Sequence, residues 1–178
     1  TLNISLVIGR TKPRHIFSRK SVERNIHVWW GGLQRNGDLM LLLAYLLTRN
    51  PEWRDANIKI MSIASSEMIK EQSEKLLGEM LPDIRINAEF RIFLKPQDKS
   101  ILQLIHEESR TAEVVFLGLA TPEKGNEEAY AERLEKLAGE FPTVFFVKNS
   151  SLFIGELLDS GNEEDRENTD TGIAGKET

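Results

Sequence analysis

From residue 25 onward, short apolar runs alternate with longer segments whose apolar residues recur at helical spacing. The short runs are rich in Ile, Val and Phe, which is typical of strands buried on both faces. Alternation of this kind indicates βαβ crossovers, and therefore an α/β fold: a mostly parallel sheet with helices on both faces, a Rossmann-like three-layer sandwich. The pattern predicts strands at Asn25–Trp30, Asn57–Ile63, Ile86–Phe93, Glu113–Gly118 and Thr143–Val147, and helices at Asp38–Thr48, Ser66–Leu81, Asp98–Ser109 and Glu127–Glu140.

Prolines and capping residues support these boundaries. All six prolines fall outside the interiors of the predicted elements, and Pro51, Pro82 and Pro142 each follow a predicted helix, where proline cannot continue the hydrogen-bond ladder. N-caps are expected at Ser65 or Ser66, Asp98 and Asn126. The last helix should cover the sheet with an apolar face made of Tyr130, Leu134, Leu137 and Phe141.

The Asp38–Thr48 helix has almost no polar side, because its run from Leu39 to Leu47 is apolar throughout. A helix that is apolar all round is usually buried on more than one side. It could pack between the sheet and neighbouring helices, or bury its outer side against a partner subunit or a missing segment of the protein, and the two are compatible. The run is nine residues long, too short for the roughly 20 residues that span a bilayer.

The two ends of the chain differ from the middle in composition. We expect residues 1–24 to hold a first strand, Leu2–Ile8, and a basic connecting arm. The α/β core domain is expected at 25–158, and residues 159–178, rich in Asn, Glu, Asp, Thr and Gly, are expected to form an acidic, disordered tail. The chain does not begin with methionine, which suggests a domain excised from a larger protein.

Composition narrows the function classes. With 178 residues and 40% apolar residues the chain fits one globular domain. It has no cysteine, which excludes disulfides and thiolate metal sites and favours an intracellular setting. The net charge of -5 comes from the acidic tail, so the rest of the chain is near neutral. It lacks the basic field of a nucleic-acid-binding protein.

The segment from Gly31 to Asp38 joins a strand to a helix, where open α/β sheets bind ligands. Gly32 and Gly37 have the spacing of the first half of a phosphate-binding loop, but Asp38-Leu39 replaces the Lys-Ser/Thr that should follow. A carboxylate at the helix N-terminus occupies the place of a phosphate. We therefore interpret the segment as a tight turn capped by Asp38, with nucleotide binding as the alternative.

No constellation for catalysis is visible. His15, His27 and His106 are spread over different segments without metal-ligand spacing, and no serine stands in a nucleophile elbow. The carboxylate pairs, such as Glu127-Glu128, are typical of solvated helix faces. The sequence thus favours a protein that is not an enzyme and has no cofactor or metal. A hydrolase or phosphotransferase is the alternative enzyme class.

Two further features are candidate contact sites. Trp29 and Trp30 end a strand and should point to opposite faces of the sheet, either as core residues or, for one of them, as an interface anchor. The basic arm could be a solvated loop, or could contact anionic lipid headgroups or an acidic partner surface. Its basic residues are Arg10, Lys12, Arg14, Arg19, Lys20 and Arg24.

The stretch Asn25–Ile63 resembles the cytoplasmic C-terminal domain of the cation–chloride cotransporters, within the amino acid–polyamine–organocation superfamily. In order, it holds a strand ending in Trp29-Trp30, the Gly31-Gly32 turn (or Gly37), the apolar helix Leu39–Leu47, and Trp53 in a short linker. The Asn-Gly-Asp-Leu-Met version resembles the prokaryotic branch. The match is strong over these residues and looser to about residue 155.

The resemblance implies a cytoplasmic domain with a fold similar to universal stress proteins. In the family, the parent protein moves chloride with sodium or potassium through a separate transmembrane part, and the domain contributes to dimerisation and regulation. The expected partners are thus a second copy of the chain and the transmembrane part. ATP-binding stress proteins carry a glycine motif from which Gly118-Leu119-Ala120-Thr121-Pro122 departs. This leaves a nucleotide-binding stress-type module as the alternative function.

Overall fold

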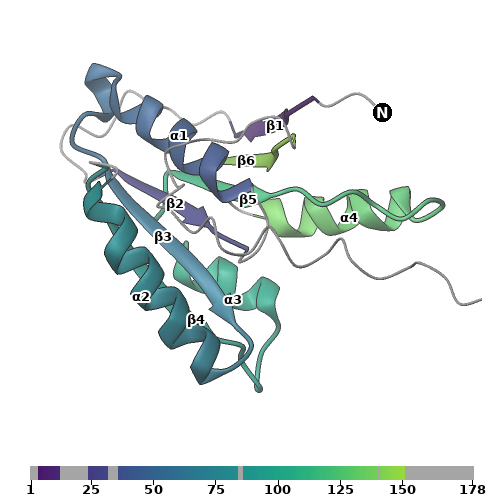
Figure 1. The fold of residues 1–178 in the computed structure, drawn as a ribbon. Helices are drawn as coiled ribbons and strands as arrows, with labels where there is room; N and C mark the ends of the chain where they lie inside the picture. The colour runs from purple at the N-terminus through teal and green to yellow at the C-terminus, as the bar shows by residue number, and fades with distance from the viewer. Residues whose placement is uncertain (1–3, 13–23, 32–35, 84–85, 140, 151–178) are drawn as a thin grey trace, which may run out of the picture.

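The architecture is a mixed sheet between two layers of helices (Figure 1). The computed structural model describes residues 4–12, 24–31, 36–83, 86–139 and 141–150. Its sheet has six strands in the order β1-β6-β5-β2-β3-β4. The strands are β1 (Leu6–Thr11), β2 (Asn25–Trp29), β3 (Asn57–Ala64), β4 (Ala88–Leu94), β5 (Val114–Gly118) and β6 (Thr143–Lys148).

Five of these strands run parallel, and β1 is antiparallel to its neighbour β6. From β2 the chain moves outward through β3 to β4, then returns to place β5 on the other side of β2. The direction of winding therefore reverses between β2 and β5, which is the topological switch point of the sheet. The predicted mostly parallel α/β sheet is confirmed.

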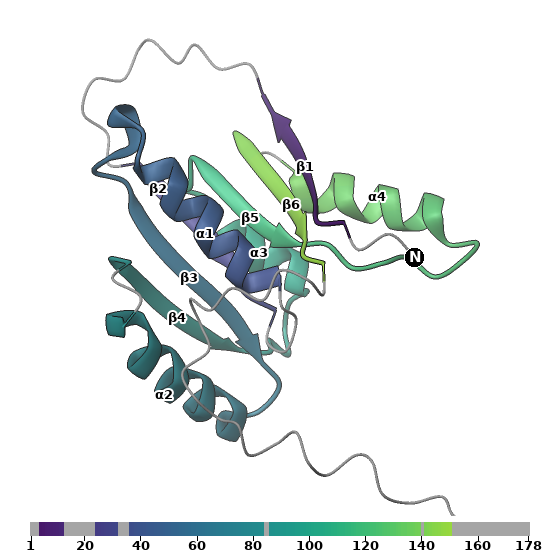
Figure 2. The same cartoon turned by 45° about the horizontal axis from the view of Figure 1, so that its top comes forward.

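Helices cover both faces of the sheet. The structure has α1 (Asn36–Thr48), α2 (Glu67–Asp83), α3 (Ile101–Glu108), α4 (Glu127–Ala138) and a short 3₁₀ turn at Pro51–Trp53. One apolar cluster joins α1 and α2 to one face, and a second joins α3 and α4 to the other. Figure 2 shows α1 in front of the sheet and α3 behind it. The predicted face of the last helix is confirmed, since its four residues pack in the second cluster.

Three local expectations need correction. Pro82 lies inside α2, in the last turn, where a missing N–H costs one hydrogen bond and the proline φ still suits a helix. Ser100, not Asp98, is the N-cap of α3: its side chain accepts from the Gln103 amide and the Gln103 side chain accepts from the Ser100 amide, a reciprocal capping box. Asn126 precedes α4 as predicted, but its side chain makes no capping hydrogen bond.

The first strand lies further along the chain than predicted, at Leu6–Thr11 instead of Leu2–Ile8. Its register explains the shift, because Leu6 pairs with Lys148 and Thr11 with Thr143, so that Gly9 and Arg10 belong to the sheet and not to an arm. Residues 13–23 and the acidic segment 159–178 are outside the described residues. In the described part, no helix combines the length and apolarity needed to cross a membrane.

Candidate functional site

The two adjacent tryptophans end β2 and point to opposite faces. Trp29 is 5% exposed and packs in the cluster of α3 and α4, where its ring stacks on Phe93 with centroids 5.8 Å apart. Trp30 is half-buried against the cluster of α1 and α2, and its backbone amide donates to the Met61 carbonyl. Strand alternation places them there. Trp29 is therefore part of the core and is not available as a surface anchor.

The start of α1 lies very close to the Trp30 ring. A Cβ on Gly37 would lie 2.4 Å from Cε2 of the Trp30 ring, so glycine is required by the packing. Gly31, by contrast, has open space around its Cα, and Gly32 lies outside the described residues. Asp38 is in the first turn of α1, which begins at Asn36, so it is not the residue that precedes the helix. Its carboxylate still lies at the favourable end of the helix dipole.

Asn36 lies at the switch point between β2 and β5. Its side chain is buried, its Nδ2 donates to the Leu119 carbonyl over 3.3 Å, and its Oδ1 accepts from the Asn149 amide over 2.8 Å. A Cβ on Gly118 would come within 3.3 Å of the same amide group. The carboxyl ends of β5 and β6 are thus held together by a side chain where α/β folds usually bind ligands. Sequence reasoning missed this role of Asn36.

Apolar side chains remain exposed at the β1 edge and on α1. Leu6, Val7 and Ile8 in β1 are 45%, 45% and 44% exposed, and Leu46 in α1 is 53% exposed. Since β1 is the terminal strand of the described sheet, its apolar side chains flank an open hydrogen-bonding edge. One side of α1 is buried, with Leu39, Met40, Leu41 and Ala44. Leu46 lies on the side of α1 that the described residues do not cover.

The basic residues of the predicted arm divide into two groups. Arg10 donates from one guanidinium nitrogen to the carbonyls of Ala138 and Gly139, at 2.8 and 2.7 Å, and so binds the C-terminal end of α4 to β1. Arg24 stacks over the Trp53 ring at 4.7 Å from its centroid, and Lys12 is half-buried. Both arginines are therefore engaged within the domain. Arg14, Arg19 and Lys20 are outside the described residues.

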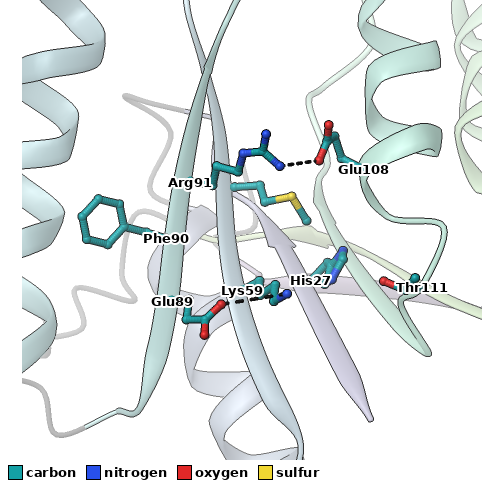
Figure 3. Close-up of a pocket in the computed structure, with 8 residues that line it drawn as sticks. His27, Lys59, Glu89, Phe90, Arg91, Glu108 and Thr111 are labelled. Carbon is teal, nitrogen blue, oxygen red and sulfur yellow. Dashed lines mark hydrogen bonds and ion pairs between the residues drawn. The ribbon is translucent and has the colours of Figure 1, made fainter. Parts of the chain in front are cut away.

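A charged cavity of about 220 Å³ lies on the face of the sheet that α3 covers, near the amino ends of β2, β3 and β4 (Figure 3). Two ion pairs border it: Lys59 Nζ lies 3.9 Å from Glu89 Oε2, and Arg91 donates to Glu108 over 2.9 Å. Its lining consists of His27, Lys59, Met61, Glu89, Phe90, Arg91, Glu108 and Thr111.

His27 is the buried polar residue of this cavity, at 2% exposure. Trp29 Nε1 donates to Ser109 Oγ over 2.8 Å, and Ser109 Oγ lies 3.2 Å from His27 Nδ1. An indole N–H can only donate, so Ser109 Oγ accepts from Trp29. The serine hydroxyl hydrogen can then be donated to Nδ1, and in this tautomer, which we assign to the ring, the imidazole proton is on Nε2. Nε2 is buried and has no hydrogen-bond partner. Burial, with the Lys59 charge second, lowers the pKa of His27 to about 4, so the ring is neutral near pH 7.

Sequence reasoning had noted His27 without giving it a role. The signal was a histidine between Ile26 and Val28 in a strand predicted to be buried on both faces, since a buried polar side chain requires partners. The partner, Ser109, is 82 residues away and could not be found from spacing. His106 lies apart on α3, where its Nε2 is 3.0 Å from the Leu137 carbonyl oxygen. No group of three His, Asp or Glu side chains suited to a metal occurs in the described ranges.

A crystal structure of the cytoplasmic domain of a prokaryotic cation chloride cotransporter has a similar fold, with a TM-score of 0.55 and 19% sequence identity. The match covers 83% of this chain and 53% of the solved one. The class is thus an α/β domain with the fold of a transporter's cytoplasmic domain.

The sequence identifies the family. A family model described as Solute carrier family 12 matches residues 10–100, about half of the chain, and the chain belongs to this family. Solute carrier family 12 member 3 of Pseudopleuronectes americanus is 31% identical over 85 residues, which cover 41% of this chain and 8% of the relative. The chain thus spans a small part of that relative and about half of the solved domain. The resemblance predicted from the Trp-Trp-Gly-Gly segment is confirmed.

Proposed function

We propose that this chain is a non-catalytic cytosolic domain that dimerises and regulates an electroneutral cation–chloride cotransporter. The parent protein would move chloride with sodium or potassium through a separate transmembrane part, and the domain would pair with its copy in the cytosol. Membership of Solute carrier family 12 supports the transporter. The likeness to the cytoplasmic domain of a prokaryotic cation chloride cotransporter supports its location.

The arrangement at the switch point supports a non-catalytic role. In a nucleotide-binding α/β domain, the crevice beyond the carboxyl ends of the strands accepts the ligand. Here the Asn36 side chain, at the start of α1, makes hydrogen bonds beyond the carboxyl ends of β5 and β6, to Leu119 and Asn149. A phosphate would have to replace these two hydrogen bonds, and unpaired buried backbone groups cost about 1–3 kcal/mol each. The alternative, a nucleotide-binding stress-type module, is therefore disfavoured.

The exposed apolar side chains at the β1 edge are the observation that supports dimerisation. Proteins usually protect an edge strand with lysine, proline, a bulge or a covering segment. β1 instead presents Leu6, Val7 and Ile8 to solvent, each almost half exposed. Two copies of such an edge can pair antiparallel about a twofold axis, which would join their sheets and bury these side chains.

Self-association can be tested by sedimentation of the chain over a range of concentrations. We expect a monomer–dimer equilibrium that Val7→Lys weakens by about tenfold or more, because a charge at the edge must be desolvated on pairing. Ile69→Lys is the matched control. Ile69 is 44% exposed, close to the 45% of Val7, but lies on α2 away from β1.

A chain that stays monomeric at all concentrations would count against the dimer. So would an Ile69→Lys variant that weakens association as much as Val7→Lys does, since this would indicate non-specific apolar contact. Calorimetry with ATP, ADP and AMP tests the rival function, and micromolar affinity for any of the three would favour the nucleotide-binding module.

A further inference from the structure

The charged cavity beside His27 contains a buried ring nitrogen, assigned above as an N–H donor, that has no hydrogen-bond partner in the described structure. His27 is 2% exposed, and its Nε2 has no partner. Its other ring nitrogen is held by Ser109, which in turn accepts from Trp29, so the ring cannot turn to satisfy Nε2 elsewhere without breaking that chain of hydrogen bonds. A buried N–H without an acceptor costs about 1–3 kcal/mol, and an acceptor in the cavity would recover it.

Lys59 is the cation whose charge acts on His27. Its charge contributes to the low pKa of His27, and Figure 3 shows its ammonium group beside the imidazole ring. The contact between Lys59 and Glu89 is long, at 3.9 Å, and the Glu89 side chain is 79% exposed. A surface ion pair of this kind contributes little, at most about 1 kcal/mol. Lys59 can therefore exchange Glu89 for another acceptor at small cost.

The second ion pair on the cavity wall is different. Arg91 donates to Glu108 at 2.9 Å, the Glu108 side chain is 27% exposed, and the guanidinium also lies over the Phe93 ring at 4.6 Å from its centroid. This pair closes one side of the cavity and neutralises Glu108. When Glu89 turns to solvent, the charge of Lys59 is the one charge of these two ion pairs that is no longer neutralised by a partner.

We propose that this cavity binds a small inorganic anion between the Nε2–H of His27 and the ammonium group of Lys59. The anion would replace Glu89 as the partner of Lys59 and would provide the acceptor that His27 lacks. The space of about 220 Å³ suits an ion as small as chloride or inorganic phosphate but not a nucleotide. Because the cavity lies at the amino ends of the parallel strands, it is separate from the switch-point crevice and from the β1 edge, and the proposal does not depend on self-association.

The test is a titration of the chain with sodium chloride and, separately, with sodium phosphate at constant ionic strength, followed by NMR. We expect the His27 ring and the Trp29 indole N–H to shift together and to saturate, with affinity on the order of millimolar. The pKa of His27 should rise as the anion binds, because a negative charge nearby favours the imidazolium form. The Trp53 indole, stacked under Arg24, should not shift. The salt that saturates identifies the ion.

Substitutions of Lys59 and Glu89, whose side chains are 42% and 79% exposed, should change the affinity for the anion in opposite directions. Lys59→Gln should lower this affinity by about tenfold or more, since it removes the charge that faces the ion. Glu89→Gln should tighten it several-fold, because Lys59 then has no competing carboxylate. Lys70→Gln is the control, because Lys70 pairs with Glu67 on α2, away from the cavity, and it should change the affinity less than twofold.

The proposal is overturned if neither salt moves the His27 and Trp29 resonances, because water alone would then fill the cavity. It is also overturned if Glu89→Gln and Lys59→Gln change the affinity in the same direction, or if Lys70→Gln has as large an effect. Each of these results leaves the dimerisation test at Val7 unaffected.

Discussion

At the residue scale, the most informative side chain is His27. It stands in the middle strand of a parallel sheet, where most neighbours are aliphatic, and it is held by Ser109 from the end of α3. Around it lie Lys59, Arg91, Glu89 and Glu108. Burial of the ring and, second, the positive charge of Lys59 both favour its neutral form.

His27 therefore makes stability depend on pH. Its pKa is about 4 in the folded chain, compared with 6.5 for an ordinary histidine. Between these values the unfolded chain binds the proton more readily, so stability is complete above pH 6.5 and falls as the pH drops toward 4. We expect a loss of about 2 kcal/mol between pH 7.5 and pH 5 from this group, measured by urea unfolding at both values.

His27→Gln provides the control for this prediction. Glutamine does not titrate, so the variant should be less stable at pH 7.5 but should lose less stability than the parent chain on going to pH 5. An equal loss in the two proteins would assign the pH dependence to other groups and contradict the assignment to His27.

At the scale of elements, the packing of α1 against the end of β2 decides which residue can stand at position 37. Gly37 is the second residue of α1, where helix propensity still favours alanine over glycine. The Trp30 ring lies where its Cβ would be. The close approach of helix and tryptophan thus outweighs helix propensity at this position.

Gly37→Ala should consequently destabilise the domain by about 1–3 kcal/mol, as expected for overpacking in a tightly packed interior. Gly31→Ala is the matched control, because a Cβ there meets nothing within 4 Å, and it should change stability by less than about 0.5 kcal/mol. Thermal unfolding of both variants measures the difference. If Gly37→Ala were as stable as the parent chain or more stable, helix propensity would be the stronger effect.

At the scale of the whole molecule, the two edges of the sheet differ. β4 carries Glu89 and Arg91 along its exposed side, both in ion pairs, and charges of this kind protect an edge. β1 carries exposed aliphatic residues instead, and Arg10 ties it to the end of α4. The two edges thus differ in their side chains, and β1 is the edge at which we propose that two copies pair.

In the cotransporter that we propose as the parent protein, a cysteine introduced at Val7 should form a disulfide with its copy more readily than one introduced at Ile69, if β1 pairs with β1. The chain itself has no cysteine, so the introduced thiols report on the contact without background from this domain. Gel analysis under oxidising conditions measures the cross-linked fraction. Equal fractions from the two positions would place the contact elsewhere.

The sequence by itself determined the fold class and the order of the elements, because apolar periodicity and proline placement are local signals. The strands at Asn57–Ala64 and Thr143–Lys148 and the helix at Glu127–Ala138 lie within two residues of the predicted limits. The resemblance of the Trp-Trp-Gly-Gly segment to the cation–chloride cotransporters was also visible in the sequence, and the family model matches residues 10–100. The local signals could not show that Pro82 continues a helix, or that Ser100 replaces Asp98 as a cap.

Tertiary structure alone decided the contacts between residues distant in the chain. His27 meets Ser109 across 82 residues, Asn36 meets Leu119 across 83, and Arg10 meets Ala138 across 128. The local spacing of these residues does not predict their contacts. The contacts depend on strand order, which places β5 beside β2 and β1 beside β6. Strand order is set by packing of the whole apolar core, and for this reason the cavity and the open edge became visible only in the folded molecule.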